Sequence, residues 1–120
     1  MHYLPNTIPD EAADALRPAF SRTENDMVEV WIARCKKDLA QLWMRDGYWI
    51  VSEVVNGRNG LVLRLVASAG KFNNELVDEV ERWGVSIGCK KVCATVRRGF
   101  MRRRPGYRIT NVCVEKRLIK

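Results

Sequence analysis

The sequence contains a single histidine, His2, among its 120 residues. A serine nucleophile usually needs a histidine base, and none is available to the four serines Ser21, Ser52, Ser68 and Ser86. Tetrahedral zinc sites usually need paired ligands, and the four cysteines form no Cys-x-x-Cys pair. The sequence therefore predicts no serine nucleophile and no metal site. The cysteines are expected to be reduced and buried, with Cys93 and Cys113 on neighbouring strands.

Long apolar runs are also missing. The longest uninterrupted run is only a few residues, too short for a membrane-spanning helix. Residues 1–30 lack the basic start and apolar stretch of a signal peptide. We therefore expect a soluble intracellular protein that forms one domain over residues 1–120.

Charge is unevenly distributed along the chain. Residues 1–60 carry 7 Lys and Arg against 9 Asp and Glu, a net charge of −2, whereas residues 61–120 carry 14 against 5, a net charge of +9. No acid lies between positions 97 and 108, which hold six arginines around a Pro105-Gly106 turn: Arg97, Arg98, Arg102, Arg103, Arg104 and Arg108. This pattern allows two interpretations, an anionic partner or a solvated basic surface.

Hydrophobic periodicity predicts three helices. The first is expected to begin at Pro9-Asp10-Glu11 and to end at about Phe20. The second should begin at residues 24–26 and bury one face made of Val28, Trp31, Cys35, Leu39 and Leu42. The third is expected over 73–87, ending at Gly88, with a buried stripe of Leu76, Val80, Trp83 and Ile87.

Short apolar runs separated by turn residues predict strands at 2–4, 42–44, 48–55, 61–67, 90–96 and 107–115. The run 61–66 is apolar apart from Arg64, which is typical of a central strand. Three consecutive antiparallel strands followed by a strand–helix–strand crossover predict an α+β fold. Its sheet should be mixed but mostly antiparallel, with helices on both faces.

Several short segments, in this order of elements, resemble a known family: Ala40–Trp43, Ile50–Val54, Leu63–Gly70, Glu81–Gly84 with Gly88-Cys89, Arg98–Arg102, Pro105–Tyr107 and Glu115–Leu118. Together they resemble the GNAT superfamily of N-acetyltransferases, and most closely the short GNAT-like proteins of tailed bacteriophages. The resemblance covers residues 27–118, so that residues 1–26 would be an N-terminal arm and helix.

The resemblance implies transfer of an acetyl group from acetyl-CoA to an amine. The cofactor is expected to lie along the third meander strand and the following helix start, at Leu65, Val66, Ala67, Ser68, Ala69, Gly70, Lys71 and Asn73. Backbone amides at a helix N-terminus bind phosphates well. Glu53 is the expected base and Tyr107 the expected acid. Arg97, Arg98 and Arg102 are expected to contact the cofactor's phosphates.

The chain departs from the family's pattern at two places. The pyrophosphate loop of the family is rich in glycine, but here it reads Ser68-Ala69-Gly70-Lys71-Phe72-Asn73, with one glycine. Arg102 stands four residues before Gly106, where the family has a tyrosine acid. The resemblance therefore implies weak or lost transferase activity.

A non-catalytic function is the alternative. In this interpretation the chain is a phage accessory or virion-associated protein whose six arginines contact DNA or another virion protein. Phe100 and Tyr107 flank these arginines and are expected either to stack on an unpaired base or to anchor the turn on the sheet. Either function places the protein in the cytoplasm of the infected bacterial host, or in the virion.

Overall fold

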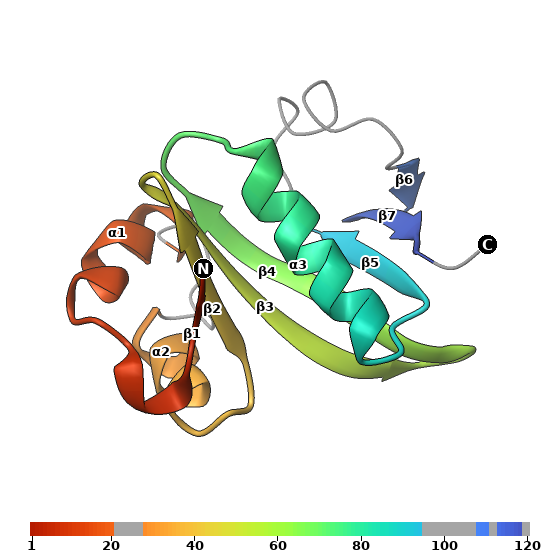
Figure 1. Cartoon of the computed structure of the whole chain (residues 1–120), viewed down its shortest axis with the longest axis horizontal. Coiled ribbons are helices and arrows are strands. Elements are labelled where there is room, and N and C mark those ends of the chain that lie inside the picture. Colours follow the sequence, from red (N-terminus) through yellow and green to blue (C-terminus); the bar gives the residue numbers. More distant parts are fainter. Residues whose placement is uncertain (21–27, 95–107, 111–112, 119–120) are drawn as a thin grey trace.

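The computed structural model describes residues 1–20, 28–94, 108–110 and 113–118; in the last two ranges, side chains are described for Lys116 and Leu118. Figure 1 shows the arrangement of its elements. In chain order these are β1 (His2–Tyr3), the 3₁₀ turn η1 (Pro5–Thr7), α1 (Glu11–Phe20), α2 (Val28–Lys36), β2 (Gln41–Arg45), β3 (Tyr48–Gly57), β4 (Gly60–Ala69), α3 (Asn74–Ser86), β5 (Lys91–Ala94), β6 (Arg108–Thr110) and β7 (Cys113–Arg117).

The strands form one seven-stranded sheet in the order β1-β2-β3-β4-β5-β7-β6. Neighbouring strands are antiparallel except β4 and β5, which are parallel and connected through α3. The predicted meander and crossover are therefore confirmed. No helix in the described part of the chain is long and apolar enough to cross a bilayer.

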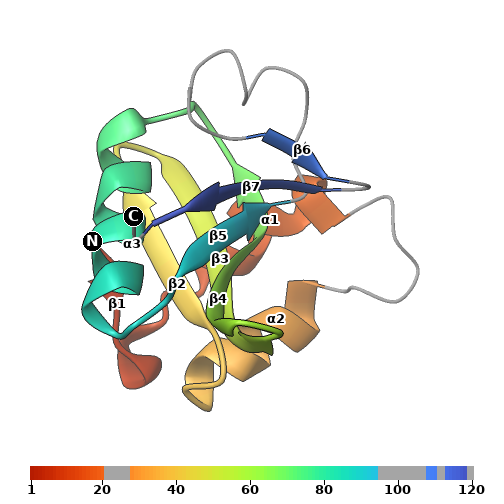
Figure 2. The ribbon, with the colours of Figure 1, turned by 90° about the vertical axis from the view of Figure 1, so that its right-hand side faces the viewer.

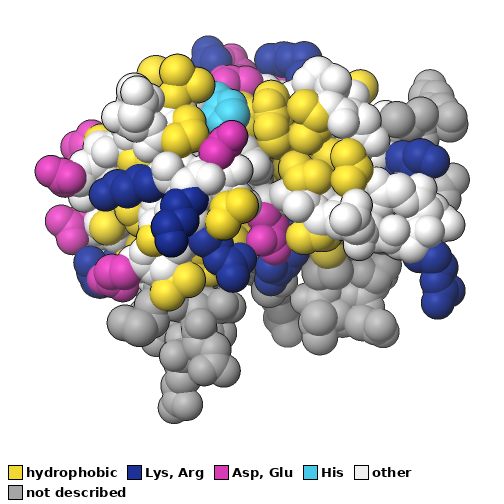
Figure 3. Space-filling view, turned by 90° about the horizontal axis from the view of Figure 1, so that it is seen from below, with side chains coloured by type: hydrophobic (Ala, Val, Ile, Leu, Met, Phe, Trp, Pro, Cys, Tyr) yellow, Lys and Arg dark blue, Asp and Glu magenta, His cyan; other side chains and the backbone are white. Residues whose placement is uncertain are grey.

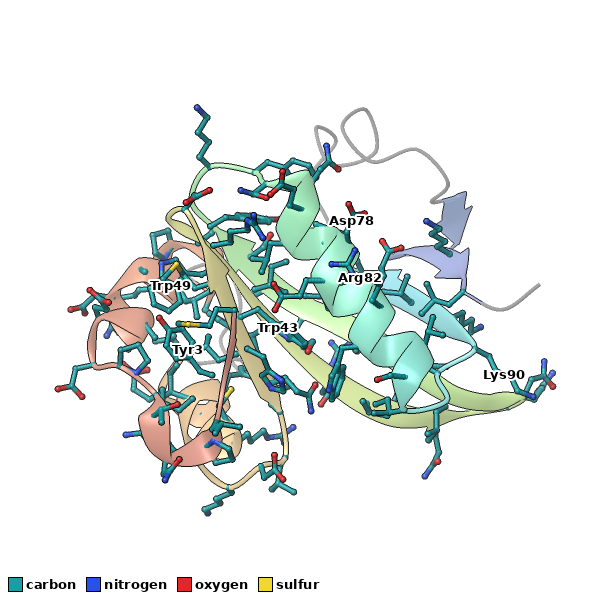
Figure 4. All side chains as sticks on the ribbon, viewed as in Figure 1. Tyr3, Trp43, Trp49, Asp78, Arg82 and Lys90 are labelled. Carbon is teal, nitrogen blue, oxygen red and sulfur yellow. The ribbon has the colours of Figure 1, made fainter. Side chains whose placement is uncertain are left out.

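Helices cover both faces of the sheet, as Figures 1 and 2 show. α3 packs on one face, where its side chains join those of Trp43, Ile50 and Leu63 in one apolar cluster. α1 and α2 pack on the other face around Trp49 and Val51. Figure 4 shows Trp43 and Trp49, which belong to different layers although their strands are paired. The structure is thus a mixed α+β fold with a core on each side of the sheet.

The third helix begins and ends with the residues that its sequence favours. The Asn73 side chain accepts a hydrogen bond from the Leu76 amide at 3.1 Å and so caps the first turn. After the helix, Gly88 takes a positive φ of 94°, which glycine adopts at little cost. Leu76 and Val80 are fully buried, as the stripe predicts, but Ile87 is exposed because the helix ends before it.

Two other predictions were wrong. The second helix ends at Lys36, since Asp38 has a φ of +60° that the helix cannot accommodate, and Leu39 is 64% exposed. Leu42 lies in β2 instead. The single strand expected over 107–115 is two antiparallel strands, β6 and β7, because folding back lets β7 pair with both β5 and β6.

A buried polar chain ties β2 to β3. The Trp43 indole Nε1 donates to the Ser52 hydroxyl, and that hydroxyl donates to the Gln41 Oε1, each at 2.9 Å. Ser52 is fully buried and pairs with Gln41 in the β2–β3 register. Because these two hydrogen bonds satisfy the buried Trp43 indole N–H and the Gln41 amide oxygen, Ser52 has a structural role in the core.

Candidate functional site

The C-terminal half of β4 continues beyond the described part of its parallel partner, β5. Paired positions run from Val62 with Lys91 to Leu65 with Ala94, whereas β4 continues to Ala69. On its other side, β4 stays paired with β3, but the register shifts between Val51 and Ser52 and leaves Val66 without an opposite residue. Such a bulge bends a strand and increases its twist. We call the segment from Val66 through the first turn of α3 the β4–α3 junction.

The loop of this junction packs against the β2–β3 turn. Gly70 has a φ of +97°, and a Cβ built on it would overlap the Gly47 carbonyl oxygen. The rings of Tyr48 and Phe72 lie 5.5 Å apart between their centroids, and the Asn73 Nδ2 lies 3.5 Å from the Asp46 Oδ2. Glycine is therefore required at position 70 for conformation and for close approach of two backbones.

Charges around the junction largely cancel. Lys71 is exposed in the loop, while Glu75 in the first turn of α3 forms an ion pair with Arg45 at 2.5 Å. Asp46 adds a second acid beside Asn73. Two basic and two acidic side chains thus surround the helix start, so the amides of α3 supply much of any attraction for an anion.

The predicted cofactor residues form one continuous segment but differ in exposure. Leu65 is buried in the α3-side core. Val66, Ala67 and Ala69 are partly buried and pack toward α1 and α2, whereas Ser68, Gly70 and Lys71 are exposed. Asn73 is the helix cap. The structure therefore offers solvent access at Ser68 and along the loop that follows β4.

The expected base, Glu53, lies on β3 opposite Arg64 of β4. Its side chain is 12% exposed and forms ion pairs with two arginines. The Oε1 accepts a hydrogen bond from the Arg64 Nη1 at 2.6 Å, and the Oε2 lies 3.6 Å from the Arg34 Nη1. We call these three residues the Glu53 cluster.

Sequence reasoning missed the partners of Glu53. Arg64 was visible as the only charge in the apolar run 61–66, which could have indicated a partner on the adjacent strand. Arg34 does not belong to the apolar face predicted for the second helix, and nothing in the local pattern connects it to β3.

The other predicted site residues lie outside the described residues. These are Tyr107 and the arginines Arg97, Arg98, Arg102, Arg103 and Arg104. Arg108 begins β6, where the backbone alone is described. Their contribution to a site stays a prediction from the sequence.

Burial affects two of the described thiols. Burial raises the pKa of the Cys35 thiol to about 11 and also raises the pKa of Cys89, so both are protonated at neutral pH. Among the described residues, no three His, Cys, Asp or Glu side chains are grouped so that they could hold a metal ion.

Comparison with known proteins adds no relative from which a function could be transferred. No protein-family model matches the chain, and no curated protein is significantly similar to it. Functional inference therefore depends on the geometry above and on the resemblance of the short segments.

Proposed function

We propose that the chain is a GNAT-like, phage-encoded protein that binds acetyl-CoA at the β4–α3 junction and has weak or lost N-acetyltransferase activity. One observation carries this proposal. β4 bulges at Val66 and leads through Gly70 directly to the N-terminus of a 13-residue helix. The bulge in β4 offers backbone groups to an extended pantetheine arm, and the helix start offers amides to a pyrophosphate.

We expect weak activity because of the residues that surround the cofactor loop and the base, Glu53. At the junction, Phe72 packs against Tyr48, and nearby acids offset the charge of Lys71. At the base, each oxygen of Glu53 already faces a guanidinium. A substrate ammonium would have to displace a guanidinium to reach the carboxylate, so Glu53 is poorly placed to act as the base.

Titration calorimetry with acetyl-CoA tests the proposal, with desulfo-CoA and ATP as comparison ligands. Gly70 is not a useful position for a variant because any side chain there would overlap Gly47. Lys71→Glu is preferable, since Lys71 is exposed, and Lys90→Glu is the matched control at the other end of α3 (Figure 4). We expect micromolar binding that Lys71→Glu weakens about tenfold, or about 1.4 kcal/mol, and that Lys90→Glu leaves unchanged. An absence of heat at millimolar cofactor would refute acetyl-CoA binding.

The charge of the second half of the chain favours a second candidate, a non-catalytic protein that contacts DNA or a virion protein. Residues 61–120 carry a net charge of +9, with six arginines between positions 97 and 108. Phosphate contacts make DNA affinity fall steeply with salt. Anisotropy with labelled duplex DNA at low and physiological salt would support this candidate if binding weakens strongly with salt and is lost when Arg102, Arg103 and Arg104 are changed to Gln. Binding unaffected by those changes would exclude it.

A further inference from the structure

The Glu53 cluster carries more positive than negative charge at the surface. Two guanidiniums share one carboxylate, so the cluster has a net charge of +1. The Arg34 and Arg64 side chains are 48% and 41% exposed, whereas Glu53 is 12% exposed. The carboxylate therefore lies below the two guanidiniums, which remain open to solvent.

With the described residues, the two arginines use few of their hydrogen-bond donors. A guanidinium has five N–H groups. Arg64 donates through Nη1 to Glu53, and Arg34 is held by an ion pair too long for a hydrogen bond. Neither arginine forms another ion pair with a described residue. The cluster thus presents two oriented but incompletely satisfied guanidiniums.

A tryptophan supports the first of these guanidiniums. The Arg34 Cζ lies 4.7 Å from the centroid of the Trp31 ring, one turn earlier on α2. Such stacking restricts the side chain and leaves its edge donors free for a planar or tetrahedral oxyanion. The Trp31 Nε1 is itself buried and has no hydrogen-bond partner among the described residues, which is unusual for an indole N–H.

We propose that Arg34 and Arg64 bind the oxyanion group of a small molecule, a phosphate or a carboxylate, and that Glu53 orients both guanidiniums for it. Guanidinium forks match either group through paired charge-assisted hydrogen bonds. Figure 3 shows basic side chains gathered on the part of the surface that carries α2. The compact cluster, with its net charge of +1, suits one oxyanion group better than a long polyanion. This inference does not depend on acetyl-CoA binding, because no residue of the β4–α3 junction takes part in it; Glu53 alone is shared with the proposed chemistry.

Two-dimensional NMR of isotope-labelled protein tests the site, with inorganic phosphate in one arm and acetate in the other at constant ionic strength. We expect saturable shifts of the amides of Arg34, Glu53 and Arg64 and of the Trp31 indole N–H. The arm with the tighter binding identifies phosphate or carboxylate as the preferred group. The spectrum of each variant also reports whether it is folded.

Variants separate a binding site from a structural ion pair. Arg64→Gln should weaken binding about tenfold through loss of charge-assisted hydrogen bonds. Glu53→Gln should strengthen it about fivefold, because the amide oxygen can still accept the hydrogen bond that orients Arg64 while the competing negative charge is removed. Arg82→Gln, the matched control on the α3 side of the sheet (Figure 4), should have no effect.

Three results would overturn the proposal. Shifts that grow linearly without saturation would indicate only general screening. Saturable binding that Arg64→Gln leaves unchanged would place the anion elsewhere. Weaker binding in Glu53→Gln would contradict the competition between carboxylate and ligand. If Arg64→Gln does not fold, Arg34→Gln replaces it, since the Arg34 side chain is half exposed.

Discussion

Replacing Gly70 by alanine should destabilise the protein more than the same replacement at Gly88. Both glycines have nearly the same positive φ, 97° and 94°. A Cβ at Gly88 meets nothing within 4 Å, whereas at Gly70 it would overlap the Gly47 carbonyl oxygen and approach the Tyr48 Cα at 3.3 Å. Comparing the two alanine variants therefore separates the energetic cost of the backbone conformation from the cost of the close contact between the β2–β3 turn and the β4–α3 junction.

The magnitudes follow from these two costs. A positive φ costs a residue with a Cβ about 1–2 kcal/mol, which is the expected loss for Gly88→Ala. Overpacking against groups that cannot move freely adds about 1–3 kcal/mol. Since the obstacle at Gly70 is backbone, we expect Gly70→Ala to lose about 2–5 kcal/mol in total.

Equilibrium urea denaturation measures the free energy of unfolding of the two variants and the parent protein. The comparison is valid if all three unfold in one cooperative transition with similar m-values. A loss for Gly70→Ala that does not exceed the loss for Gly88→Ala would show that the turn does not contact the junction. The geometry assigned to the candidate cofactor site would then be wrong.

Three further changes test the core and its pH dependence. Ser52→Ala should lower the free energy of unfolding by about 1–3 kcal/mol, because it leaves the buried Trp43 N–H unsatisfied. Urea denaturation that shows no loss would contradict this hydrogen bond. Leu76→Ala should lower the free energy of unfolding by about 2–5 kcal/mol. Val85→Ala, at an exposed position of the same helix, should change it by no more than about 0.5 kcal/mol. Equal losses would contradict the burial assigned to α3. Burial lowers the pKa of His2 below its ordinary 6.5. As the pH falls, the unfolded chain therefore binds this proton before the folded protein does. The free energy of unfolding should thus decrease as the pH drops below 6.5. In thermal unfolding curves, His2→Phe should remove this part of the pH dependence of stability. An unchanged pH dependence would show that other groups cause it.

Local patterns were sufficient to predict most of the fold. Turn residues such as Asp46-Gly47 separate the meander strands, and the stripe of Leu76 and Val80 predicts the helix of the crossover. The end of α2 was missed because Leu39 continues the helical spacing of apolar residues, although Asp38 leaves helical geometry. Spacing alone cannot detect a single residue with positive φ.

The candidate site also has one part that local sequence patterns predict and one part that they do not. The junction could be predicted because Leu65 to Asn73 are consecutive in the sequence and lie between a strand and a helix. The Glu53 cluster could not, because its geometry depends on the β3–β4 register and on how α2 packs against the sheet. Ser52 illustrates the same limit, since its hydrogen bonds exist only when β2 and β3 are in register.

The central claim is that acetyl-CoA binds at the β4–α3 junction, and mapping by two-dimensional NMR tests it most directly. Acetyl-CoA should shift the amides of Val66 to Leu76 in a saturable manner, with desulfo-CoA shifting the same set. Few changes are expected at the far end of α3, near Gly88. Saturable shifts confined to other parts of the chain, or none at millimolar cofactor, would contradict the claim.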